Sequence, residues 1–167
     1  IWYGSKDLLH ELKAEVIGWY YTLYLLLIAS MVGIVITNDI FNMFVFLEIC
    51  AIASCGIISI KESRDCIEAA FKYLVLSVLG SGAFLLAVAM LYMVTGHLNF
   101  TFMAEALPEA MALYPNNVLV ALALLIVGLG VKAALFPLHV WLPDAHSSAP
   151  SPSSAVLSAL VIKVYAV

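Results

Sequence analysis

The chain has 167 residues, of which 65% are hydrophobic and 11% are charged, and its formal net charge is −4. Soluble domains carry about 25% charged residues, so this composition excludes an ordinary water-exposed surface, and lipid is the expected solvent. No basic run is present, which argues against nucleic acid as a partner. Cys50, Cys55 and Cys66 lack the spacing of a metal site or a disulfide set, so we predict that they are packing residues.

Four apolar segments are long enough to cross a membrane as helices, and a fifth is cut short. We predict spans at about 16–36, 41–60, 69–94 and 117–136, a second half-helix reaching 145, and a truncated span from 153. Asp39 is placed to cap the second span. Residues 61–65 form a hydrated loop, and residues 96–117 form a polar connection containing Pro108 and Pro115. The predicted fold class is an all-α polytopic membrane protein, with residues 1–167 as one incomplete transmembrane domain.

The ends of the chain suggest a fragment of a longer protein. It begins at Ile1 rather than Met, and it stops at Val167 inside an apolar stretch. A helix from Ser153 to Val167 reaches only about 22 Å, which is short of a hydrocarbon core of about 30 Å. We therefore expect further helices before and after these residues.

The positive charges of the connecting segments predict the orientation. Lys6, Lys13, Lys61 and Arg64 fall on one side if the first two spans alternate, whereas the 96–117 connection contains no Lys or Arg. Cytoplasmic loops carry the excess of positive charge. Residues 1–15 and the 61–68 loop are thus predicted to be cytoplasmic, in the inner (plasma) membrane of a prokaryote.

Small residues on the third span predict a face for close helix packing. Ser77, Gly80, Ser81 and Gly82 allow neighbouring backbones to approach, as pairs of membrane helices prefer.

Two ionisable residues lie deep in the predicted spans, where a charge costs about 2.5–3.5 kcal/mol. Glu48 has no strongly polar neighbour in its helix, so we expect it to be protonated or paired with a cation from another helix. Lys132 stands five residues before Pro137, which removes a backbone donor and clashes with the carbonyl of Ala133. We predict a discontinuous helix near Lys132–Pro137, a device that recurs in transporters. A fixed structural ion pair, or a lysine that reaches the interface, is the alternative.

Two further lysines are candidates for a proton relay. Lys163 lies about 15 Å into the fifth span, and a desolvated lysine can exchange its proton near neutral pH. Lys72 follows Glu68 by one helical turn, a spacing that an interfacial salt bridge explains almost as well as a role in ion movement.

Two histidines flank the stretch Trp141–Asp144. Histidine is the side chain that exchanges protons most readily near neutral pH. His139 and His146 lie in a segment rich in Pro and Ser, so they are candidates to link the lysines. Hydrogen bonds that satisfy an irregular backbone are an equally good explanation. A zinc site is not expected, because no convincing further ligands accompany the two histidines.

Three stretches together resemble a known family. Asn38–Glu48, Gly130–Lys132 continuing into Phe136–His146, and Leu160–Tyr165 resemble the antiporter-like membrane subunits. This family comprises the proton-pumping subunits of respiratory complex I, the Mrp-type sodium/proton antiporters and the membrane-bound hydrogenases. The resemblance implies a larger bundle with two inverted repeats, of which this chain is about one. The stretch from Asp39 to Glu48 is most similar to the Mrp D-type and hydrogenase subunits.

The resemblance also implies roles for individual residues. Glu48 is the acid paired with Lys132 on the broken helix, and Lys163 is the next relay lysine. His139 and His146 belong to the connection between those lysines. Lys72 matches an additional lysine of the family.

The expected function is translocation of protons, with sodium/proton exchange as an alternative, by a subunit of a hetero-oligomeric membrane complex. The expected partners are other membrane subunits, protons or sodium ions, and the lipid bilayer. The Mrp D-type or hydrogenase type is favoured, and a complex I pumping subunit is the alternative. A stand-alone secondary transporter and a non-transporting scaffold subunit are rival classes. No cofactor or metal is expected, and no pattern of a redox site points to catalysis by the chain itself.

Overall fold

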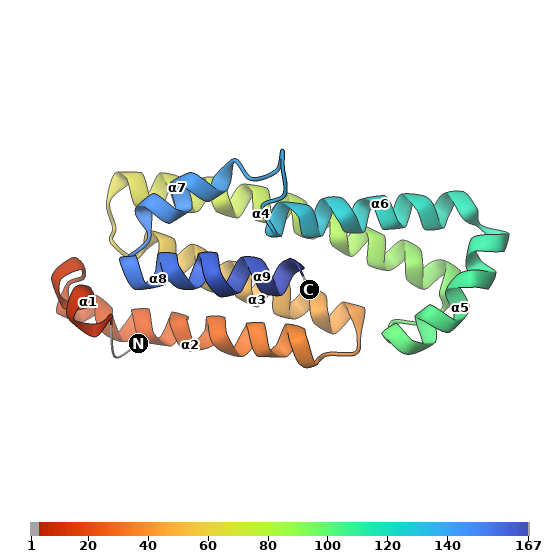
Figure 1. The fold of residues 1–167 in the computed structure, drawn as a ribbon, viewed down its shortest axis with the longest axis horizontal. Helices are drawn as coiled ribbons and strands as arrows, with labels where there is room; N and C mark the ends of the chain where they lie inside the picture. The colour runs from red at the N-terminus through yellow and green to blue at the C-terminus, as the bar shows by residue number, and fades with distance from the viewer. Residues whose placement is uncertain (1–3, 167) are drawn as a thin grey trace.

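The structure, a computed structural model, describes residues 4–166 and is helical throughout, without a strand in that range (Figure 1). The helices, with one π-helical turn, η1, are α1 Ser5–Glu11, α2 Ala14–Ile36, α3 Ile40–Ser59, α4 Arg64–Thr95, α5 Phe100–Leu113, α6 Pro115–Lys132, α7 Trp141–Ser148, α8 Ser151–Val156, η1 Leu157–Val161 and α9 Ile162–Ala166.

Four of these helices, α2, α3, α4 and α6, are long and apolar enough to cross a membrane. A helix satisfies its backbone polar groups internally, which lipid requires because it offers no hydrogen bonds. The Asp39 carboxylate accepts the Asn42 backbone N–H at 2.8 Å and so caps α3, as predicted. The helix α4 begins earlier than expected, at Arg64, where Ser63 caps it through the Cys66 N–H.

The 96–117 connection differs from the prediction, because most of it is the helix α5. Asn99 caps this helix by accepting the Thr101 N–H at 3.0 Å, and Pro108 lies inside it. A proline removes only one backbone donor. The prediction of an irregular connection here therefore gave too much weight to Pro108. In Figure 1, α5 lies at the end of the bundle between α4 and α6.

The long helix α4 is the centre of the bundle, with α3, α6 and α7 packed along it (Figure 1). The backbones of α4 and α6 approach each other closely at Gly80 and Gly128. A Cβ built on Gly128 would lie 2.8 Å from the Gly80 carbonyl oxygen, so neither position has room for a side chain. The predicted small-residue face is correct for Ser77, Gly80 and Ser81, which are buried. Gly82 is exposed and points away from α6, because it is two residues from Gly80 on a helix.

Charged side chains hold the loops together at one end of the bundle. Lys61 pairs with Glu11 at 2.8 Å, and Lys13 pairs with Glu62 at 3.4 Å. Partial burial opposes ionisation of Glu11, but hydrogen bonds from Lys61 and Ser151 outweigh it and lower the pKa of that carboxyl. The two segments with the predicted excess of positive charge, the start of the chain and the 61–68 loop, therefore lie together at this end of the bundle.

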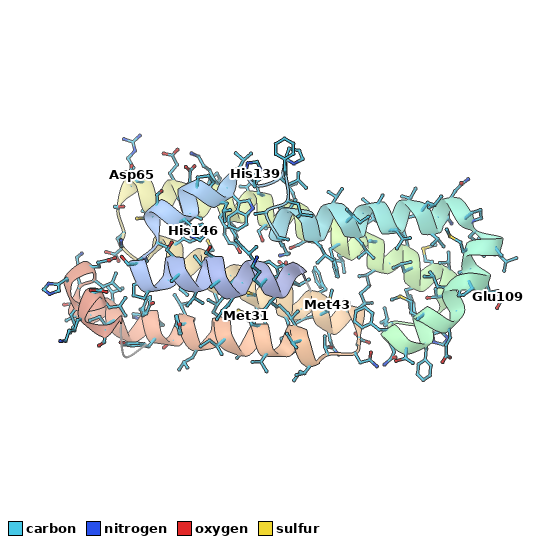
Figure 2. All side chains as sticks on the ribbon, viewed as in Figure 1. Met31, Met43, Asp65, Glu109, His139 and His146 are labelled. Carbon is cyan, nitrogen blue, oxygen red and sulfur yellow. The ribbon has the colours of Figure 1, made fainter. Side chains whose placement is uncertain are left out.

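The opposite end is tied by backbone hydrogen bonds between two loops. The Ile40 N–H donates to the Leu98 carbonyl at 2.9 Å, and the Phe100 N–H donates to the Asn38 carbonyl at 3.1 Å. Asp65 and Glu109 mark the two ends in Figure 2. The two loops fix the α2–α3 hairpin against the start of α5.

The predicted discontinuity after α6 is confirmed. The helix ends at Lys132 rather than near residue 136, and a turn containing Ala134 at φ 53° leads to α7. The Trp141 Nε1–H donates to the Val131 carbonyl at 2.9 Å, which satisfies one of the carbonyls left free at the end of α6. The segment thus consists of the long helix α6 and the short helix α7, joined by irregular backbone.

Candidate functional site

An ion pair joins α3 to α6 near the middle of the bundle. The Lys132 Nζ donates to the Glu48 Oε1 at 3.1 Å. Lys132 is 4% exposed and the Glu48 side chain is 30% exposed. Removing charged groups from water is costly unless they are paired and hydrogen-bonded. Glu48 and Lys132 each provide the opposite charge and a hydrogen bond to the other.

Two serines of α4 complete the surroundings of this pair. The Lys132 Nζ also donates to the Ser77 Oγ at 3.2 Å. The Ser81 hydroxyl donates to the same Glu48 oxygen that Lys132 contacts. Ser77 and Ser81 are one helical turn apart, so α4 presents both hydroxyls to the ion pair. We refer to Glu48, Ser77, Ser81 and Lys132 as the ion-pair site.

Two electrostatic interactions favour the ammonium form of Lys132. At an effective dielectric constant near 20, charges 3.1 Å apart attract each other by about 5 kcal/mol. Lys132 is also the last residue of α6, where the free carbonyls carry partial negative charge. The attraction from Glu48 is the larger of the two, so a change at Glu48 has the stronger influence on the lysine.

Lys72 lies apart from the ion-pair site and has two acidic partners. Its Nζ contacts Glu68 at 2.9 Å, as the helical spacing predicted, and Asp144 at 3.1 Å. Asp144 belongs to α7, so Lys72 connects the second half-helix to α4. About half of each side chain is exposed, so water and salt weaken both pairs and they contribute little to stability.

The two histidines do not reach the ion-pair site. The His146 Nδ1 lies 2.9 Å from the Ser154 Oγ, a contact between α7 and α8. The His139 Nδ1 is buried and has no hydrogen-bond partner within residues 4–166. Figure 2 shows His139 in the turn before α7 and His146 further along that helix. Their predicted part in a relay therefore has no direct contact to support it.

Lys163 lies on an exposed face of α9 and has no ion-pair partner among the described residues. The π-helical turn η1 directly precedes α9. Such turns are frequent at functional sites, since the extra residue rotates all that follows. Within residues 4–166, no ion pair joins Lys163 to the ion-pair site.

Three polar residues of these sites were missed or misread in the sequence. Ser77 and Ser81 were interpreted as packing residues, although their one-turn spacing was a signal that both face one partner. Asp144 was not singled out, because its partner Lys72 is far away in the sequence. No group of three or more His, Cys, Asp or Glu in residues 4–166 is arranged to hold a metal ion.

A bundle of apolar helices with a broken helix and a charged pair in its interior defines a polytopic membrane protein with an ionisable core. The chain belongs to the family described as NADH:quinone oxidoreductase/Mrp antiporter, transmembrane, whose model matches residues 37–167.

Curated relatives of two kinds match the chain. It is 42% identical over 149 residues to the N-type subunit of NADH-quinone oxidoreductase from Desulforudis audaxviator, covering 89% of this chain and 29% of the relative. It is 34% identical over 147 residues to the D-type subunit of the Na(+)/H(+) antiporter from Bacillus subtilis, covering 88% of this chain and 29% of the relative. The chain thus spans less than a third of the length of these relatives. Because relatives of both kinds match, these comparisons assign the family but not the type of subunit. The Mrp or hydrogenase type stays a prediction.

Solved structures share the fold. A chain of the membrane-bound sulfane sulfur reductase, an archaeal respiratory membrane complex, aligns with a TM-score of 0.81 and 44% identity, covering 87% of this chain and 29% of that one. A chain of the Mrp complex from Dietzia sp. aligns with a TM-score of 0.73 and 32% identity, covering 86% of this chain and 27% of that one. The antiporter-like helix bundle predicted from the sequence is therefore confirmed.

Proposed function

We propose that this chain is part of a proton-translocating subunit of a multi-subunit membrane complex, and that its proton passes through Lys132 under the control of Glu48. The observation that carries the proposal is the 3.1 Å contact between the two side chains inside an apolar bundle. Buried ionisable groups in membranes are usually functional. The relatives named for antiport and for quinone reduction support the same function.

The mechanism follows from the geometry of the ion-pair site. While Glu48 is ionised, its charge favours the ammonium form of Lys132. When a proton neutralises Glu48, or the carboxylate moves away, Lys132 loses an attraction of about 5 kcal/mol. Its proton can then leave, and the Ser77 hydroxyl is already in place as a hydrogen-bond partner of the neutral amine. Lys163, Lys72 and the two histidines are candidates for later steps.

The orientation proposed for the chain rests on its cationic end. The described part of that end carries Lys6, Lys13, Lys61 and Arg64, whereas the loops around α5 carry no Lys or Arg. By the positive-inside rule, the first end faces the cytoplasm of a prokaryotic cell. The other subunits of the complex are the proposed partners.

Glu48→Gln tests the proposal, because glutamine keeps an oxygen for Ser81 and Lys132 but removes the charge. We expect proton translocation by the complete complex in proteoliposomes to fall by about 100-fold or more, the scale of a lost proton-transfer group. Glu109→Gln is the matched control, since Glu109 is exposed and lies at the α5 end. Near-normal pumping by the Glu48 variant would refute the role. A loss of assembled complex in proportion to activity would indicate a scaffold instead.

A further inference from the structure

The start of α8 is tied to three other helices by serine side chains. Within its first four residues, three hydroxyls make contacts to α1, α2 and α7. In Figure 1, α8 begins at the end of the bundle where α1 lies. We call these residues the serine anchor: Ser151, Ser153 and Ser154. Because no two of them share a partner, they hold the start of α8 from several directions.

Glu11 is the charged partner of the serine anchor. Its Oε1 accepts a hydrogen bond from the Ser151 Oγ at 2.7 Å, and its Oε2 pairs with the Lys61 Nζ at 2.8 Å. One carboxylate thus joins α1, α8 and the loop between α3 and α4. A Cβ built on Gly4 would lie 2.5 Å from the Pro152 Cγ. The backbone before α1 therefore packs directly on the same turn of α8.

The other two contacts of the serine anchor lie further inside the bundle. The Ser153 Oγ donates to the Tyr20 hydroxyl at 2.8 Å, and both residues are buried. Removing either partner would leave a buried polar group unpaired, which is costly. The Ser154 Oγ lies 2.9 Å from the His146 Nδ1 and so joins α8 to α7. His146 therefore has a structural contact in addition to its predicted part in a relay.

The helix that begins at the serine anchor carries Lys163. The elements α8, η1 and α9 follow one another without a gap from Ser151 to Ala166. Lys163 lies about 18 Å along this helix from Ser151, at a rise of about 1.5 Å per residue. Backbone hydrogen bonds make consecutive turns move together, so a shift of the first turn also displaces Lys163. No ion pair within residues 4–166 holds Lys163 itself, and its position consequently depends on how its helix is held.

We propose that Glu11, acting through the serine anchor, is a positioning residue that holds the helix of Lys163 in place for translocation. The contact with α8 stands on the geometry alone, whereas its effect on transport rests on the proposed function. A carboxylate that only tied the surface loops together would need no bond to Ser151. The 2.7 Å contact between these two side chains is the observation that favours the positioning role.

The hold on α8 can be measured without a transport assay, by hydrogen–deuterium exchange of the complete complex. Glu11→Ala removes both contacts of the carboxylate, and we expect the backbone amides of α8 and η1 to exchange about tenfold faster than in the wild type. Asp7→Ala is the matched control, because Asp7 is an exposed acid of the same helix without an ion pair in the described part of the chain. Equal exchange in the two variants would overturn the proposal.

The effect on transport is tested by loss and rescue. Misplacing a reacting group by about 1 Å can cost about 100-fold in rate. Because Ser153 and Ser154 keep their contacts, we expect Glu11→Ala to lower proton translocation per assembled complex by about tenfold. The double variant Glu11→Lys with Lys61→Glu keeps the net charge, reverses the ion pair and places an ammonium that can donate to the Ser151 oxygen. We expect it to restore both slow exchange and translocation.

The outcomes separate this inference from the proposed function. Normal translocation by Glu11→Ala, together with loss in Glu48→Gln, would overturn the positioning role and leave the proposed function standing. If Glu48→Gln also pumps normally, the proposed function fails, and the exchange experiment still decides whether Glu11 holds α8.

Discussion

Replacing Lys132 with Met is expected to lower proton translocation by the complete complex by about 100-fold or more. Methionine fills a similar volume but can neither carry a proton nor pair with Glu48. The carboxylate would keep only the hydrogen bond from Ser81, and breaking a buried pair on one side costs about 3–5 kcal/mol. Translocation per assembled complex in proteoliposomes, with thermal unfolding of the purified complex, measures both effects.

The matched control is Lys13→Met, which breaks an ion pair of the same type at the surface. Lys13 lies 3.4 Å from Glu62 with 78% of its side chain exposed, so its pair contributes about 0–1 kcal/mol. Lys13→Met should pump normally. A Lys132→Met complex that also pumps normally would show that Lys132 does no more than hold α6 to α3.

The second large effect is expected at the contact between α4 and α6. A Cβ on Gly128 would lie 2.8 Å from the Gly80 carbonyl oxygen and 2.9 Å from the Phe84 backbone nitrogen. Backbone atoms cannot move aside cheaply, so Gly128→Ala must separate the two helices. We expect a loss of about 1–3 kcal/mol of stability. We also expect reduced translocation, because α6 carries Lys132 and α4 carries Ser77 and Ser81.

Gly82→Ala is the control for this prediction. Gly82 lies on α4 close to Gly80, but a Cβ added to it meets nothing within 4 Å. Alanine should therefore leave stability unchanged or raise it slightly, since glycine is a poor helix former. Thermal unfolding of both variants makes the comparison. Equal stability for the two variants would show that α4 and α6 are not packed through Gly80 and Gly128.

The central features of the site were predictable from the sequence because they are costly in lipid. A glutamate and a lysine that are buried in apolar helices each need a partner of opposite charge, and an ion pair satisfies both. Pro137 marked the end of the helix beside Lys132, since proline cannot continue the backbone hydrogen bonds. That argument predicted a protonated Glu48 or a cation from another helix, and the resemblance to the antiporter-like subunits implied that the cation is Lys132, which the structure places 3.1 Å from Glu48.

Other features depend on tertiary contacts that leave little trace in the sequence. Asp144 meets Lys72 only because α7 folds back along α4. The helix α5 forms although Pro108 lies within it, because Asn99 caps it and its apolar residues pack on the bundle. The π-helical turn η1 directly precedes the helix that carries Lys163, and no residue type predicts such a turn.

Lys132→Arg tests the central claim most directly. Arginine keeps the positive charge for Glu48 but does not release its proton in a protein. If Lys132 carries the transported proton, the variant complex should assemble and yet lose proton translocation per assembled complex. If the charge serves only to bind α6 to α3, the arginine complex should pump at nearly the wild-type rate, and that result would contradict the account.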